Sequence, residues 1–202
     1  ANADETCISP VRIEGGPATG VADVNRAYDF SGAAHGYYAT HFGRDGVDDA
    51  GSPLVSSVRY CETAGACPYA NAFWNGEQLT FGAGYATDDV VAHELTHGVT
   101  EHTANLFYWY QSGAINESMS DVFGELIDLG NGAGTDTPGV RWEIGEDIPG
   151  IGTLRDMADT LYNPKKAPYV NHFKGTELIV EHIEKFVCPT ITSNQIIGGK
   201  SF

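Results

Sequence analysis

The sequence predicts an α+β fold, with strands confined to the first half of the chain. Short β-type segments bounded by turn residues occur only between residues 54 and 82. Helical spacing of apolar residues occurs before these segments and again between residues 88 and 129. With 42% hydrophobic residues in a chain of 202, there is enough apolar material for one large domain or two small lobes.

The first half follows an irregular stretch, residues 1–20, that is rich in Gly, Pro and Thr. Apolar residues then recur at helical spacing, and Gly43 and the Asp45-Gly46 pair provide stop signals. We therefore expect helices over 21–30 and 32–43, strands over 54–60 and 78–82, and a candidate third strand at Ala72–Trp74.

The second half is expected to be mostly helical. Asp88 and Asp89 place acidic side chains at the start of a long helical pattern, as a helix N-terminus prefers. We expect helices from Asp88 to about Asn105 and from about Ala114 to Leu129, then a loop over 130–152 and an amphipathic helix after residue 175. The predicted domains are a β-containing N-terminal lobe (1–87), a helical region with the acidic loop (88–174) and a divergent tail (175–202).

The charge of the chain limits its partners. The formal net charge is −16, and a surface this acidic repels phosphate, which argues against nucleic acid as a partner. No apolar run approaches the ~18 residues of a membrane span. All five lysines lie between Lys165 and Lys200, in the same part of the chain as five late isoleucines. This composition step suggests that the tail is a separate element or has a different origin.

The pairing of the four cysteines indicates whether the chain resides in an oxidising or a reducing compartment. Cys61 and Cys67 enclose five residues, a spacing that suits a local disulfide, and two free thiols are the alternative. Cys7 and Cys188 can pair with each other, but spacing does not decide this. The sequence has neither a CxxC motif nor Cys/His metal spacing, which argues against a zinc-thiolate site. If the disulfide forms, we expect a secreted, extracellular chain.

The sequence His93-Glu94-Leu95-Thr96-His97 is an H-E-x-x-H motif. Residues four apart on a helix share a face, so both imidazoles can bind one zinc ion, while Glu94 can reach a water at that ion. The alternative is a surface helix that happens to carry two histidines.

A third zinc ligand is needed for a catalytic site. One known solution places a His six residues after the second, but that residue is Thr103 here, and His102 lies about 140° around the helix from His97. The other solution takes a Glu from a following helix, and Glu117 is so placed. Asp121 lies one turn later, where it can accept a hydrogen bond from a ligating imidazole.

These motifs, with Asn71-Ala72-Phe73-Trp74-Asn75-Gly76 before them and Trp-Glu-Ile-Gly-Glu and Leu-Arg-Asp-Met after them, resemble the thermolysin family of zinc endopeptidases over about 21–160. The resemblance implies a thermolysin-like fold with a central H-E-x-x-H helix and a C-terminal helical lobe that is incomplete here. The implied zinc ligands are His93, His97 and Glu117, with Glu94 as general base and Asp121 behind a ligating His. The implied reaction is zinc-dependent hydrolysis of peptide bonds in protein or peptide substrates by a monomeric, secreted enzyme that binds neither nucleic acid nor membranes.

The resemblance also assigns residues around the substrate. Tyr108 matches a tyrosine of the family that stabilises the oxyanion. Arg155 matches an arginine that holds a substrate carbonyl. Asn71 and the backbones of Ala72 and Trp74 match an edge strand that binds substrate main chain. A packing role remains open for Tyr108, which lies in an aromatic run, and a structural ion pair remains open for Arg155.

The resemblance further implies bound calcium and a hydrophobic pocket. Asp89, Asp128, Glu143 and Glu146 match calcium ligands, and oxygen ligands suit Ca²⁺. Arg141 replaces an acid of the family pattern, so we expect one calcium ion rather than a pair; an ordinary acidic surface is the alternative. In the family, a hydrophobic pocket favours a bulky apolar side chain just after the scissile bond. The residues that match this pocket are Val90, Ile144 and Leu154. The alternative is that they are ordinary core residues.

The resemblance covers about 21–160, and the sequence beyond about 174 departs from the family pattern. The family segment Asp-Asn-Gly-Gly-Val-His, whose His helps to stabilise the transition state, is replaced by Gly175–His182. His182 lies at almost the expected distance from Arg155 and is the candidate for that role, although its neighbours do not match. We therefore hypothesise that the residues beyond about 174 are not native family sequence. A zinc-binding fragment with weak or no activity is the alternative function.

Overall fold

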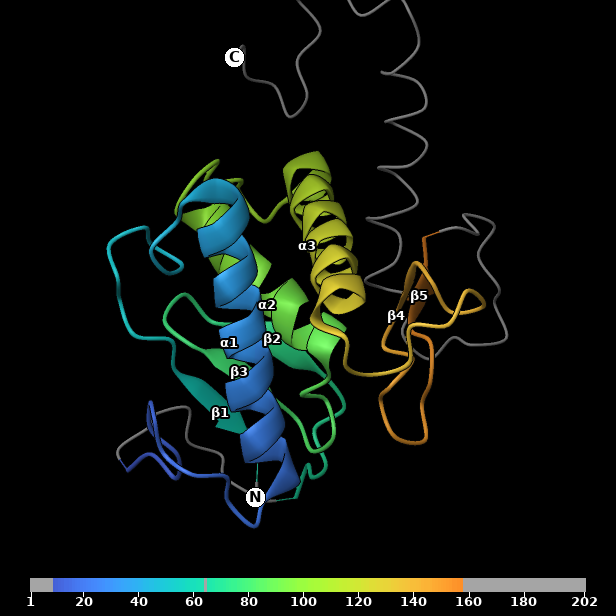
Figure 1. The fold of residues 1–202 in the computed structure, drawn as a ribbon. Coiled ribbons are helices and arrows are strands. Elements are labelled where there is room, and N and C mark those ends of the chain that lie inside the picture. The colour runs from blue at the N-terminus through green and yellow to red at the C-terminus, as the bar shows by residue number, and fades with distance from the viewer. Residues whose placement is uncertain (1–8, 64, 158–202) are drawn as a thin grey trace, which may run out of the picture.

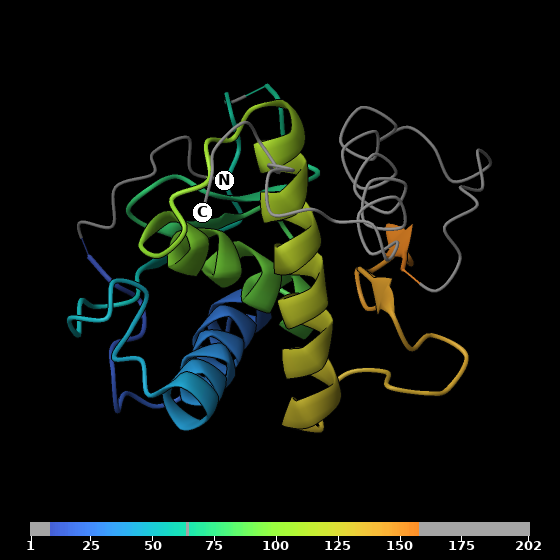
Figure 2. The same ribbon diagram turned by 90° about the horizontal axis from the view of Figure 1, so that it is seen from above.

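The structure is a computed structural model of the chain, and it describes residues 9–63 and 65–157. These residues have the predicted α+β fold, in which α1 and α2 pack against one small sheet and α3 packs against α2 (Figure 1). The long helix α3 stands between α1 and α2 on one side and a two-stranded β4–β5 ladder on the other (Figures 1 and 2). The elements are α1 (Ala22–Phe42), β1 (Ser56–Val58), β2 (Ala72–Trp74), β3 (Leu79–Phe81), α2 (Asp88–Glu101), α3 (Tyr110–Asn131), β4 (Glu143–Ile144) and β5 (Arg155–Asp156).

Helix α1 is continuous, so the prediction of two helices broken near residue 31 is wrong. Its buried face consists of Ala27, Ser31, Ala34 and Tyr38, whose spacing is helical across the expected break. The predicted end is correct: Gly43 adopts φ +68°, its N–H donates to the carbonyl of Ala39, and the N–H of Arg44 donates to the carbonyl of Tyr38.

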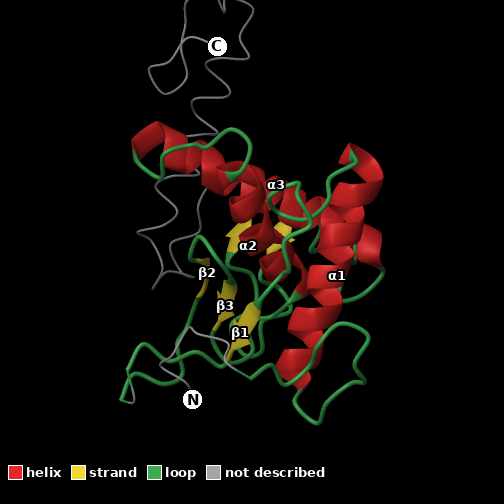
Figure 3. Cartoon of the chain, turned by 90° about the vertical axis from the view of Figure 1, so that its left-hand side faces the viewer, coloured by secondary structure: helices red, strands yellow, loops and turns green. Residues whose placement is uncertain are grey.

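The three predicted strands form a sheet in the order β1–β3–β2, so β2 lies at one edge (Figure 3). The central strand β3 is parallel to β1 and antiparallel to β2, and all three of its side chains are buried. In the β2–β3 register, Asn75 donates its N–H to Gln78 and Gly82 donates to Asn71. Since ladder bonds alternate along a strand, the peptide groups of Ala72 and Trp74 point away from β3, toward α2.

Helix α2 is the most buried helix, and twelve of its fourteen residues are buried. It ends at Glu101, before the expected end near Asn105, and a turn over residues 102–104 leads to Asn105, which adopts φ +45°. Helix α3 begins at Tyr110 and continues through Gly130, where we predicted its end. It stops where Gly132 adopts φ +71°. The region 130–152, predicted as loop, is irregular apart from the last two residues of α3 and strand β4.

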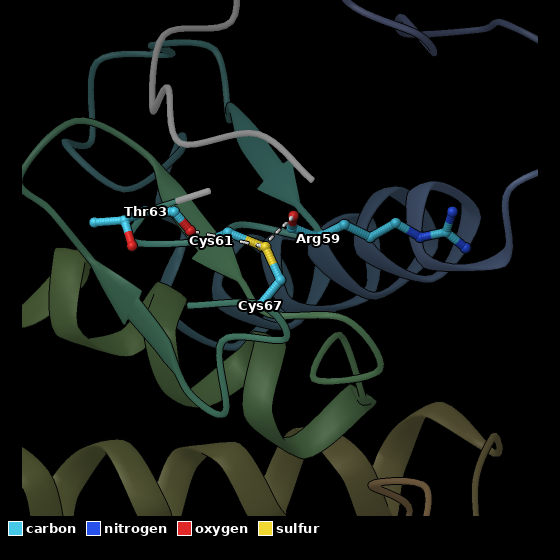
Figure 4. Close-up of a disulfide and its surroundings, with 4 residues drawn as sticks. All are labelled: Arg59, Cys61, Thr63 and Cys67. Carbon is cyan, nitrogen blue, oxygen red and sulfur yellow. Dashed lines mark hydrogen bonds between the residues drawn. A yellow bond between two sulfur atoms is a disulfide. The ribbon is translucent and has the colours of Figure 1, made fainter. Parts of the chain in front are cut away.

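The predicted disulfide between Cys61 and Cys67 is present, with the two Cα atoms 5.2 Å apart. It closes the loop between β1 and β2, beside Arg59 and Thr63 (Figure 4). Within the described residues, no helix is long and apolar enough to cross a membrane. The Cys7–Cys188 pair, the amphipathic helix after residue 175 and His182 fall outside the described residues.

Candidate metal centre and active site

Three side chains from two helices converge beside the sheet. Helix α2 presents His93 and His97 on one face, and their Nε2 atoms lie 2.9 Å apart. Helix α3 supplies Glu117, whose Oε2 lies 3.3 Å from Nε2 of His93 and whose Oε1 lies 3.6 Å from Nε2 of His97. The three candidate ligands predicted from the sequence are therefore brought together.

The size and chemistry of this group fit zinc. Ligand atoms 2.0–2.1 Å from a tetrahedral ion lie about 3.3–3.4 Å apart, and the three observed separations bracket that value. One carboxylate and two imidazoles form a donor set typical of a catalytic zinc site with an open fourth position. Glu94 lies next to them, and ligand atoms of His93, Glu94 and His97 fall within 4.8 Å of one another.

The group favours positive charge. Burial lowers the pKa of His93, but hydrogen bonds to Asp121 and Glu117 outweigh it and raise that pKa to about 10. Burial raises the pKa of Glu117, yet its bond to His93 and the nearby cations lower it to about 2. The Glu117 carboxylate, which faces Nε2 of His93, would also stabilise a metal cation bound between these two side chains.

Each imidazole is held through its second nitrogen. Nδ1 of His93 lies 2.8 Å from Asp121, which also accepts hydrogen bonds from Nε and Nη2 of the half-buried Arg155. Nδ1 of His97 lies 2.7 Å from Oδ1 of Asn116 and 3.1 Å from the hydroxyl of Ser120. Asn116 and Ser120 were not predicted from the sequence. The signal that could have identified them is their position on α3, one residue before and three residues after Glu117.

A cleft of about 640 Å³ opens onto this group. The predicted substrate-binding residues Asn71, Ala72 and Trp74 line it from the β2 edge, and Arg155 lines it from β5. Glu94 accepts a hydrogen bond from the backbone N–H of Trp74 at 3.0 Å.

Two aromatic residues, Phe107 and Tyr108, also line the cleft. The Tyr108 side chain is 55% exposed, and its ring centroid lies 5.9 Å from that of His97, at the mouth of the cleft. Of the three predicted pocket residues, Val90 and Leu154 line the cleft, whereas Ile144 is fully buried and belongs to the core.

A second cluster contains the predicted calcium residues at the far end of the helices. Asp89 is buried and accepts hydrogen bonds from the backbone N–H groups of Val90 and Gly145. The carboxylate of Glu143 accepts a hydrogen bond from Thr153. In contrast, Asp128 Oδ1 and Glu146 Oε2 are buried oxygens that have no hydrogen-bond partner among the described residues.

The electrostatics of this second cluster fit a bound cation. Burial, followed by the neighbouring acids Asp88 and Asp136, raises the pKa of Asp128 to about 11. Burial and Asp89 raise the pKa of Glu146 to about 8. Glu125, which sequence reasoning missed, has another buried oxygen with no partner, and burial raises its pKa. Carboxylate oxygens that are buried without partners are costly unless a cation compensates them, and Ca²⁺ takes such ligands.

Comparisons with known proteins agree with this geometry. The catalytic-domain model of the thermolysin metallopeptidases matches residues 19–101, and the model of their alpha-helical domain matches residues 104–186. The chain is 48% identical to a zinc metalloproteinase of Renibacterium salmoninarum over 163 residues, which cover 74% of this chain and 30% of that protein. It is 37% identical to an extracellular metalloprotease of Pectobacterium carotovorum subsp. carotovorum over 185 residues, or 88% of this chain and 51% of that one.

A solved structure shares the fold. The precursor of protealysin, a metalloproteinase from Serratia proteamaculans, superposes with a TM-score of 0.63 at 38% identity, covering 74% of this chain and 48% of that one. The chain thus spans about a third to a half of the length of these relatives. From both family models and from these relatives, the chain belongs to the thermolysin metallopeptidase family.

Proposed function

We propose that this chain carries the active centre of a secreted, zinc-dependent endopeptidase. The observation that carries the proposal is the convergence of His93, His97 and Glu117, with Glu94 beside them, on a cleft edged by β2. Zinc held there would polarise the scissile carbonyl and lower the pKa of an attacking water.

The residues of the chain would share the remaining work. Glu94 takes the proton of the attacking water and passes it to the leaving amine. The hydroxyl of Tyr108 donates a hydrogen bond to the developing oxyanion. A donor of this kind stabilises the transition state by about 3–4 kcal/mol. Arg155 is positioned by Asp121 and holds a substrate carbonyl, and His182 is the candidate for a further transition-state contact.

The exposed edge of the sheet provides a surface for substrate binding. The outward peptide groups of β2, apart from the Trp74 N–H that donates to Glu94, can pair with an extended polypeptide by strand addition, and Asn71 lies at the start of that edge. The buried Val90 and the cleft-lining Leu154 provide apolar surface for a bulky hydrophobic residue just after the scissile bond. The disulfide and the name of the Pectobacterium relative support an extracellular location.

A structural calcium ion is part of the proposal. Asp89 and Asp128 supply buried carboxylates from α2 and α3, Glu146 supplies a buried carboxylate oxygen from the following loop, and Glu143 and Glu125 lie in the same region. Bound there, calcium would join α2 and α3 to the loop that leads to Arg155. We further expect a monomer that binds neither nucleic acid nor membranes.

One specific observation favours a second candidate, a zinc-binding chain without turnover. The family segment that supplies the transition-state His is replaced by Gly175–His182.

A single assay separates the two candidates. The 202-residue chain is incubated with casein, Zn²⁺ and Ca²⁺, beside Glu94→Gln and a chelator control, while bound zinc is measured by elemental analysis. The endopeptidase predicts cleavage that both the chelator and Glu94→Gln abolish, although Glu94→Gln retains zinc. Stoichiometric zinc without cleavage in the wild-type chain establishes the second candidate, and a chain that binds no zinc contradicts both.

A further inference from the structure

Trp74 makes two hydrogen bonds to helix α2 from opposite parts of the residue. Its backbone N–H donates to Oε2 of Glu94 at 3.0 Å, and its indole Nε1–H donates to Oε2 of Glu101 at 2.7 Å. The first bond reaches the proposed general base. The second reaches an exposed glutamate that no part of the proposed mechanism uses.

The helix places both acceptors on one face. Glu94 and Glu101 are seven residues apart, which is two turns of α2, and Gly98 lies between them on the same face. A Cβ atom at Gly98 would lie 3.1 Å from Cε2 of Trp74 and 3.2 Å from Cζ2. The indole therefore lies directly on the backbone of α2, between the two carboxylates.

The strand that carries Trp74 has little other support. Strand β2 is three residues long and ends at Trp74 before the turn to β3, and among residues 9–63 and 65–157 it pairs only with β3. Its outer edge faces the cleft, where no other strand of the described residues fixes the height of the Trp74 N–H above α2. The contact of the indole with α2 supplies that restraint.

We propose that Glu101 is a positioning residue for Glu94. By accepting the indole N–H, Glu101 fixes Trp74 on α2, and the backbone N–H of Trp74 in turn holds the Glu94 carboxylate toward the zinc ligands. The inference rests on the proposed protease function for its kinetic consequence only. The coupling between Glu101, Trp74 and Glu94 is a property of the folded chain.

The test compares Glu101→Ala with Glu101→Gln, because the Gln amide oxygen can still accept the indole N–H. Glu77→Ala is the matched control, since it removes an exposed acid from the adjacent β2–β3 turn. The first measurement is NMR on the zinc-loaded chain, which has only three indole N–H groups, those of Trp74, Trp109 and Trp142. The second measurement is kcat and KM on a peptide substrate, together with zinc affinity.

We expect Glu101→Ala to speed exchange of the Trp74 indole hydrogen at least about tenfold and to shift the backbone amide resonance of Trp74. We also expect it to lower kcat about tenfold, with KM and zinc affinity within about twofold of wild type, because misplacing a reacting group costs rate more than binding. Glu101→Gln and Glu77→Ala should remain close to wild type in all readouts.

Unchanged indole exchange and an unchanged Trp74 amide in Glu101→Ala would overturn the proposal, as would a Glu101→Gln variant as impaired as Glu101→Ala. If the wild-type chain binds zinc but has no turnover, the protease function fails and the NMR comparison alone decides the coupling. The two failures are therefore distinguishable.

Discussion

Nδ1 of His93 lies 2.8 Å from Oδ1 of Asp121, and Arg155 donates to both oxygens of the same carboxylate. This chain of contacts joins α2, α3 and β5, three elements that are distant in sequence. It fixes the ring of His93 so that Nε2 faces His97 and Glu117.

Replacing Asp121 by Asn should weaken zinc binding about 10–100-fold, because the amide is a poorer partner for His93 and leaves Arg155 without its carboxylate. Competition with a chromophoric chelator measures the affinity. Glu77→Gln, an exposed change of the same kind, is the control. An Asp121→Asn chain with wild-type zinc affinity would show that the carboxylate does not support the ligand.

Replacing Asp128 by Asn should have opposite effects with and without calcium. Without calcium the variant should be at least as stable as wild type, because it removes a buried carboxyl whose pKa is raised to about 11 by burial and by Asp88. With calcium the wild-type chain should gain stability, by about 2.7 kcal/mol at a concentration 100-fold above Kd. The variant should gain much less.

Thermal unfolding with calcium, with magnesium and with chelator measures this difference. Magnesium serves as the control because it demands stricter geometry than calcium. Equal calcium responses in wild type and Asp128→Asn would remove Asp128 from the ligand set. No response in the wild type would remove the site itself.

Replacing Tyr38 by Phe should change how stability depends on alkaline pH. The Tyr38 hydroxyl lies 2.8 Å from that of Thr96, which donates to the carbonyl of Ala92, so Tyr38 is the donor. Burial raises the pKa of Tyr38 from 10.0 to about 12. The stabilisation is therefore complete below pH 10 and is lost as pH rises toward 12, because only the unfolded chain releases the proton in that range.

Urea unfolding at pH 8 and at pH 11.5 tests this. Tyr38→Phe should cost about 1 kcal/mol at pH 8, the usual value of such a hydrogen bond. The wild-type advantage should shrink or reverse at pH 11.5. Tyr110→Phe, at a side chain that is 79% exposed, is the control. A wild-type advantage equal at both pH values would contradict the assignment.

Much of the metal centre was predictable because its geometry is local. Two histidines four residues apart on a helix must share a face, and α2 places His93 and His97 so. The helix stop at Gly43 and the short disulfide loop likewise depend on nearby residues only. The break predicted near residue 31 was wrong because the helix continues through it. Ala27, Ser31, Ala34 and Tyr38 form one buried face that packs against the rest of the protein.

The sequence by itself determined which side chains could bind zinc, since ligand type and helical spacing are properties of a few neighbouring residues. Only the tertiary structure decided that Asn116 and Ser120 hold His97, that Trp74 connects Glu94 to Glu101, and that Glu125 joins the buried acids. These contacts depend on how α2 packs against α3 and β2, and such packing is set by the whole core rather than by any local pattern.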